Sequence, residues 1–82
     1  MYVQELRIGV QSPDEVDRII VTELPDGQFQ FEAVLWAGES KIYFVPHRSF
    51  DTAVEAKEGG IEWTAARGAE TLLVEYQNAQ KT

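Results

Sequence analysis

The chain has 82 residues, which suits one domain with one hydrophobic core, and 44% of them are hydrophobic, too many for a disordered chain. It contains no cysteine, which excludes disulfides and thiolate metal sites. Fourteen acidic and seven basic residues give a formal charge of −7, which disfavours binding to the like-charged backbone of nucleic acids.

The N-terminal residues alternate between apolar and polar and predict a half-buried strand over 2–10. Its apolar side would carry Leu6, Ile8 and Val10. A different signal follows, because Ser12 can cap a helix, Pro13 fits a first helical position and Glu15 completes a capping box. These residues predict one short helical turn over 13–17.

Three strands are predicted next, as an antiparallel meander. β-Branched residues favour a strand over 18–24, and a proline and a glycine make a turn of 24–27. Alternating aromatic and polar residues predict a strand over 28–36. A turn at 37–40 then leads to the last strand of the meander, over 41–45.

A helix is predicted from about Phe50 to Arg67, with Ser49 as its cap and Gly68 as its stop. The helical period places an apolar stripe toward the sheet. That stripe consists of Phe50, Ala53, Val54, Ile61 and Ala65. A final strand over 70–76 and a flexible tail over 77–82 complete the chain.

This order of elements predicts a single α+β domain over residues 1–76. We expect a two-layer sandwich, in which one long helix covers one face of a mostly antiparallel sheet of about five strands. The order would be strand, turn, three strands, helix, strand.

One helix cannot cover both faces of such a sheet. The face away from the helix would carry four apolar side chains, and these are Val34, Trp36, Tyr43 and Val45. Either another segment of the chain covers this patch, or the patch meets another molecule. Cross-strand pairs that stabilise an open face are the simpler interpretation.

Trp63 is a further candidate for an interface. A regular helix places it opposite the apolar stripe, with small neighbours at Ala56, Gly59 and Ala66. Exposed tryptophan is enriched at interfaces. The alternative is a break at Gly59-Gly60, because two glycines weaken a helix by about 2 kcal/mol relative to alanine, and such a break would turn Trp63 into the core.

Two charged features allow other hypotheses. His47, Arg48 and Ser49 precede the predicted helix, whose free N–H groups favour an anion; the alternative is an ordinary loop. An acidic edge along the helix could bind a basic surface or imitate a row of phosphates; the alternative is a solvated flank. That acidic edge consists of Asp51, Glu55, Glu58 and Glu62.

Catalysis has little support, since the chain offers one histidine and no recognisable nucleophile or metal-ligand spacing. We therefore expect a non-enzymatic interaction module that self-associates or binds another protein, without metal or cofactor. A small-anion or metabolite-binding domain is the alternative, and an acidic decoy for nucleic-acid-binding proteins is a third. Without a basic N-terminal run or a long apolar stretch, we expect a cytoplasmic protein that does not contact membranes.

Overall fold

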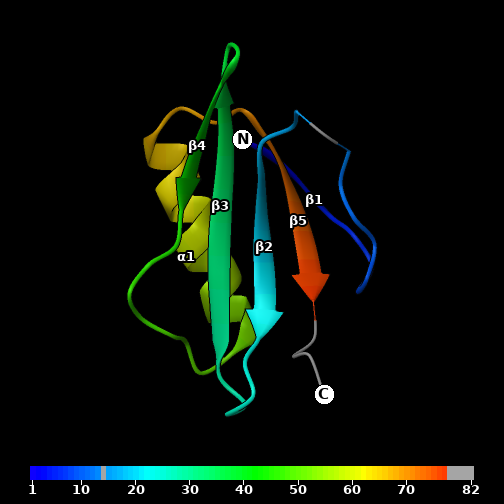
Figure 1. Cartoon of the computed structure of the whole chain (residues 1–82), viewed down its shortest axis with the longest axis vertical. Coiled ribbons are helices and arrows are strands. Elements are labelled where there is room, and N and C mark those ends of the chain that lie inside the picture. Colours follow the sequence, from blue (N-terminus) through cyan, green and yellow to red (C-terminus); the bar gives the residue numbers. More distant parts are fainter. Residues whose placement is uncertain (14, 78–82) are drawn as a thin grey trace.

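A computed structural model describes residues 1–13 and 15–77 (Figure 1). Its strands are β1 (Tyr2–Glu5), β2 (Arg18–Glu23), β3 (Phe29–Ala37), β4 (Ser40–Phe44) and β5 (Thr71–Gln77), and its helix is α1 (Ala53–Ala66). The predicted α+β fold of five strands and one helix is confirmed. Residues 78–82 of the predicted tail lie outside the described residues. Within the described ranges, no helix is long and apolar enough to cross a membrane.

The strands follow the order β1-β5-β2-β3-β4 across the sheet. The predicted antiparallel meander of β2, β3 and β4 is confirmed. Strand β5 returns from α1 to lie between β1 and β2, parallel to both. As a result, β1 and β4 form the two edges of the sheet (Figure 1).

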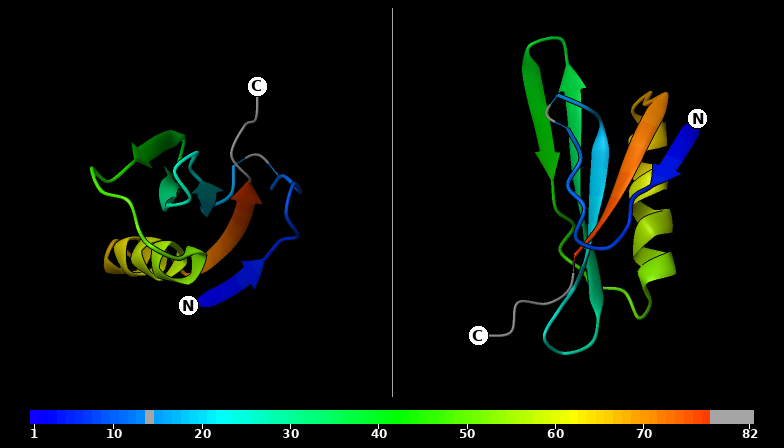
Figure 2. Two further views of the ribbon diagram at one scale, coloured as in Figure 1. Left: turned by 90° about the horizontal axis from the view of Figure 1, so that it is seen from below. Right: turned by 90° about the vertical axis from the view of Figure 1, so that its right-hand side faces the viewer.

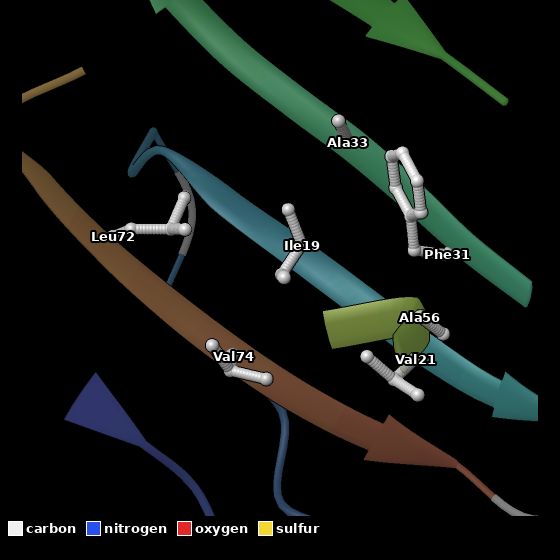
Figure 3. Packing of buried hydrophobic residues seen from close by; sticks show 7 residues of the cluster. All are labelled: Ile19, Val21, Phe31, Ala33, Ala56, Leu72 and Val74. Carbon is white, nitrogen blue, oxygen red and sulfur yellow. The ribbon is translucent and has the colours of Figure 1, made fainter. Parts of the chain in front are cut away.

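The core lies between α1 and the middle of the sheet. In β3, alternate residues turn Phe31 and Ala33 toward the helix. Side chains of β2, β3, β5 and the helix meet there (Figure 3). The fully or almost fully buried cluster consists of Ile19, Val21, Phe31, Ala33, Ala56, Leu72 and Val74. Burial of this apolar area is the main force that holds the helix on the sheet.

The helix begins later than predicted, and its cap is Thr52 rather than Ser49. The backbone of Phe50 is still extended, because it exchanges two hydrogen bonds with Phe29, at 2.8 and 2.7 Å. Thr52 then accepts the Glu55 N–H at 3.1 Å, as a capping residue does. The predicted cap is wrong because a long-range strand contact holds this segment in place.

The buried face of α1 also differs from the predicted stripe. Val54 is 56% exposed and Ala65 is exposed, whereas the buried positions of the helix are Ala56, Gly60 and Thr64. A Cβ atom on Gly60 would lie 2.8 Å from Ile19 Cδ1. Of the predicted stripe, Phe50, Ala53 and Ile61 do pack against the core. The prediction was wrong for Val54 and Ala65, because the smallest residues allow the close approach of this helix to the sheet.

The N-terminal strand is shorter than predicted. β1 ends at Glu5, and beyond it Ile8 is 65% exposed and Val10 is exposed too. The chain still follows β5 for a few residues, since the Leu6 N–H donates to Val74 O at 2.9 Å. Gly9 then turns with φ of 86°, which breaks the alternation that the sequence suggested.

The helical turn predicted over 13–17 is absent from the described part of that segment, residue 14 being outside it. Glu15 has φ of 62°, which is not helical, and the Ser12 hydroxyl donates to the Glu75 carboxylate instead of capping a turn. This segment passes around the β1–β5 edge onto the side of the sheet opposite the helix (Figure 2).

Candidate functional site

The open face of the sheet does not present the apolar patch that the sequence suggested. Val34 is only 2% exposed, between Arg18 on β2 and Tyr43 on β4 in the register of the sheet. Trp36 is half-buried, and its backbone N–H donates to the Asp17 carboxylate at 2.7 Å. The segment leading into β2 therefore occupies part of this face, which is one of the two alternatives that the sequence left open.

Strand β4 remains uncovered. Tyr43 is 57% exposed on the open face, and Ile42 is 46% exposed on the face that carries the helix. The two side chains point to opposite faces because successive residues of a strand alternate. Val45 follows the strand and is half-buried. An edge strand with apolar side chains exposed on both faces is the clearest candidate surface in the described residues.

The sequence did not suggest Ile42 as an interface candidate. Ile42 lies on the face that carries the helix, but α1 packs mainly against β2 and β3, so the helix does not cover the middle of β4. The available signal was the place of β4 at the end of the meander, where a strand can form the edge of the sheet.

Trp63 lies on the helix side, apart from the other interface candidates. Its ring stacks on Phe44 at 4.6 Å with an interplanar angle of 1°, and the Arg67 guanidinium lies 3.9 Å from the ring centroid. Both groups cannot fit against one face of the ring, so they occupy opposite faces. Trp63 is thus half-buried by its own chain, and α1 continues through Gly59-Gly60 without the break considered above.

The three residues of the predicted anion site do not lie at the helix N-terminus. His47 and Arg48 are exposed, and the Arg48 guanidinium lies 4.5 Å from the Phe50 ring centroid. The Ser49 hydroxyl donates to the Gln28 side chain, and Thr52 caps the helix in its place. The site therefore lacks the free helix amides that motivated it, and anion binding stays a prediction.

The acidic edge is divided between two settings. Asp51 precedes the helix and accepts the Gln28 amide at 3.0 Å. The three glutamates of the acidic edge line a hollow of about 420 Å³ beside the helix. The hollow is lined by Glu55, Glu58, Glu62, Arg48, Pro46, Gly59 and the aromatic residues Phe31, Phe44, Phe50 and Trp63. The decoy hypothesis and the solvated-flank interpretation both stay untested predictions.

Two polar contacts that the sequence did not suggest tie distant segments together. Glu75, only 5% exposed, accepts the Ser12 hydroxyl and lies 3.4 Å from Arg18 Nε. The Tyr76 hydroxyl donates to Glu5. That hydrogen bond lowers the pKa of Glu5, whereas burial and the carboxylate raise the pKa of Tyr76. No local pattern signals such pairs, because their partners are far apart in the sequence.

Comparisons of the chain with family models, with curated proteins and with solved structures find no match. Function must therefore be argued from the surface itself, and the strongest feature of that surface is the β4 edge.

Proposed function

We propose that the chain is a non-enzymatic protein-interaction module that self-associates through edge strand β4. The uncovered edge, with Ile42 and Tyr43 exposed on opposite faces, carries the proposal. The outer side of an edge strand offers unpaired N–H and C=O groups, and another strand satisfies them most directly. Burial of the two side chains would add apolar area to these hydrogen bonds.

The other edge strand, β1, is a less suitable site for the addition of a strand than β4. β1 has four residues and no exposed aliphatic side chain between its ends, and its Glu5 carboxylate is already held by Tyr76 and Lys57. In β4 itself the single charged residue is Lys41, so the strand carries no acidic side chain of its own. Contact between two copies is therefore least opposed by repulsion at β4.

We also propose that the protein is located in the cytoplasm. A chain without cysteine needs no oxidising environment for folding, which suits the cytoplasm. The partner there would be a second copy of the chain.

Light scattering over a series of protein concentrations tests the function. We expect the mass to rise from the 9.3 kDa of one chain toward twice that value, and Ile42→Lys to keep the chain monomeric. Val54→Lys is the matched control, because Val54 is another exposed apolar residue, on α1 and away from β4. A wild-type chain that stays monomeric at every concentration would overturn the proposal.

A further inference from the structure

The β3–β4 hairpin determines which backbone groups of β4 are free. Its loop is the two-residue turn Gly38-Glu39, with Gly38 at φ of 65°, and Ala37 and Ser40 close it. The closing pair of such a hairpin is hydrogen-bonded, and bonding alternates along an antiparallel ladder. Ser40, Ile42 and Phe44 thus bond to β3. The N–H and C=O groups of Lys41 and Tyr43 point outward from the edge.

From this alternation we infer that two copies pair their β4 strands antiparallel, about a two-fold axis at Ile42, with Lys41 of each copy opposite Tyr43 of the other. The inference rests on the proposed function and specifies its geometry. In this register the outward-pointing residues meet only each other, so both Lys41–Tyr43 pairs exchange two backbone hydrogen bonds. The Ile42 residues then form the central pair without hydrogen bonds, where side chains approach most closely.

Side-chain chemistry agrees with this register. The two Ile42 side chains, each about half exposed in the single chain, would cover each other on the helix face. On the open face, the Lys41 ammonium, which lies 5.9 Å from the Trp36 ring of its own chain, would meet the Tyr43 ring of the second copy. Burial and the neighbouring Glu32 carboxylate raise the pKa of Tyr43, and this carboxylate adds a negative charge near the incoming lysine.

Other two-fold registers are less favourable. An axis at Lys41 would set two ammonium groups directly opposite each other, and like charges in that position destabilise a strand pair. An axis at Tyr43 would pair Lys41 with Val45, which lies beyond the end of β4 and is followed by Pro46. Proline has no N–H to continue the ladder. The axis at Ile42 uses all five residues of the strand.

The pairing would join the two sheets into one, with both helices on the same face. Directly opposite residues of a strand pair share a face, so the Ile42 pair sets the two α1 helices on one side. Phe44 would lie opposite Ser40 of the second copy, so the β4 edge of each copy would be fully used in the pairing. The surface therefore closes on itself after two copies, as an isologous interface does.

Disulfide trapping tests the register, because the full chain has no cysteine of its own. Ile42→Cys places two thiols at the axis, where Cα atoms about 4.5 Å apart suit a disulfide. Ser40→Cys is the matched control on the same strand, since the two residues would be roughly 14 Å apart along the paired strands. Under mild oxidation we expect Ile42→Cys to form linked dimer at least about tenfold faster than Ser40→Cys. Circular dichroism would verify that both variants are folded.

The outcomes separate the register from the function. A disulfide-linked dimer that forms with Ile42→Cys and not with Ser40→Cys supports the inferred register. Equal or faster linkage through Ser40→Cys, or no linkage although light scattering shows a dimer, would overturn the register and leave self-association standing. Monomers by light scattering together with no linkage would overturn both.

Discussion

At the scale of single residues, the Tyr76–Glu5 contact joins β5 to β1 and couples the stability of the fold to pH. The Tyr76 hydroxyl lowers the pKa of Glu5 below 4.5. The ionised Glu5 carboxylate therefore stabilises the fold above pH 4.5, and this stabilisation is lost as pH falls through the folded-state pKa. Burial and the carboxylate raise the pKa of Tyr76 above 10.0, so its contribution is present below that value and is lost as pH rises through the folded-state pKa. The contact is therefore fully stabilising only between these two limits.

Tyr76→Phe removes the hydroxyl and keeps the ring. We expect the pKa of Glu5 to rise toward its ordinary value, as followed by an NMR titration of the Glu5 carboxyl group. The stability difference from wild type should be greatest between pH 4.5 and pH 10.0. Tyr2→Phe is the control, because Tyr2 is exposed on the opposite side of β1. An unchanged Glu5 titration would show that the hydroxyl does not control this carboxylate.

At position 60 we expect glycine to be more stabilising than alanine, although alanine is usually favoured inside a helix. Alanine normally improves a helix interior by about 1 kcal/mol. Here its Cβ would lie 2.8 Å from Ile19 Cδ1 and 3.1 Å from Ile19 Cγ2, and Ile19 is completely buried. Overpacking of a core costs about 1–3 kcal/mol, which outweighs the gain in helix propensity.

Gly60→Ala should therefore lower the free energy of unfolding measured in urea, by about 1 kcal/mol. Gly59→Ala should cost less, because its nearest contacts are ring atoms at 3.2 and 3.3 Å. A Gly60→Ala variant more stable than wild type would contradict the close helix–sheet contact.

At the scale of elements, the middle strands were predictable from local patterns, whereas the end of β1 and the start of the helix were not. The sequence predicted β2 and β3 to within two residues, because β-branched residues mark β2, alternation marks β3 and a turn separates them. Ser12 and Ser49 both resembled caps, yet each donates its hydroxyl to a residue far away in the sequence, Glu75 or Gln28. Such long-range contacts override a capping motif and leave no local trace.

Local sequence patterns also identify only part of the candidate surface. The sequence placed Tyr43 on the face away from the helix, and Tyr43 is 57% exposed there. The exposure of Ile42 depends on where α1 lies across the sheet, and that position follows from small residues such as Ala56 and Gly60, which hydrophobic periodicity does not identify.

Removal of the Thr52 hydroxyl, which caps the helix, should affect the helix, whereas removal of the Ser49 hydroxyl should not. Thr52→Ala is expected to lower the free energy of unfolding by about 1 kcal/mol and to speed hydrogen exchange at the Glu55 amide. Ser49→Ala removes only a hydrogen bond to Gln28 and should leave that amide unchanged. Equal effects of the two changes on Glu55 exchange would contradict the assignment of the cap.

At the scale of the whole molecule, two copies that associate bring together charges of −7 each. The resulting repulsion acts over the whole surface, whereas the attraction at β4 is local and largely apolar. Salt screens the long-range part, since the Debye length falls from roughly 14 Å at 0.05 M to roughly 4 Å at 0.5 M. The net charge therefore opposes the proposed dimer and salt should favour it.

We expect the dimer to strengthen as salt is raised over this range, as measured by sedimentation equilibrium. The variant Ile42→Lys should remain monomeric at both salt concentrations, which separates screening from unspecific association. A wild-type dimer that weakens as salt rises would mean that charge attraction dominates the interface, contrary to an interface centred on Ile42.

The most direct measurement of the β4 edge is hydrogen exchange at its individual amides. In a single chain, the amides of Ser40, Ile42 and Phe44 bond to β3, whereas those of Lys41 and Tyr43 face solvent. Pairing predicts that protection of the Lys41 and Tyr43 amides rises with protein concentration. Fast exchange at these two amides at every concentration, with Ile42 protected throughout, would contradict self-association through β4.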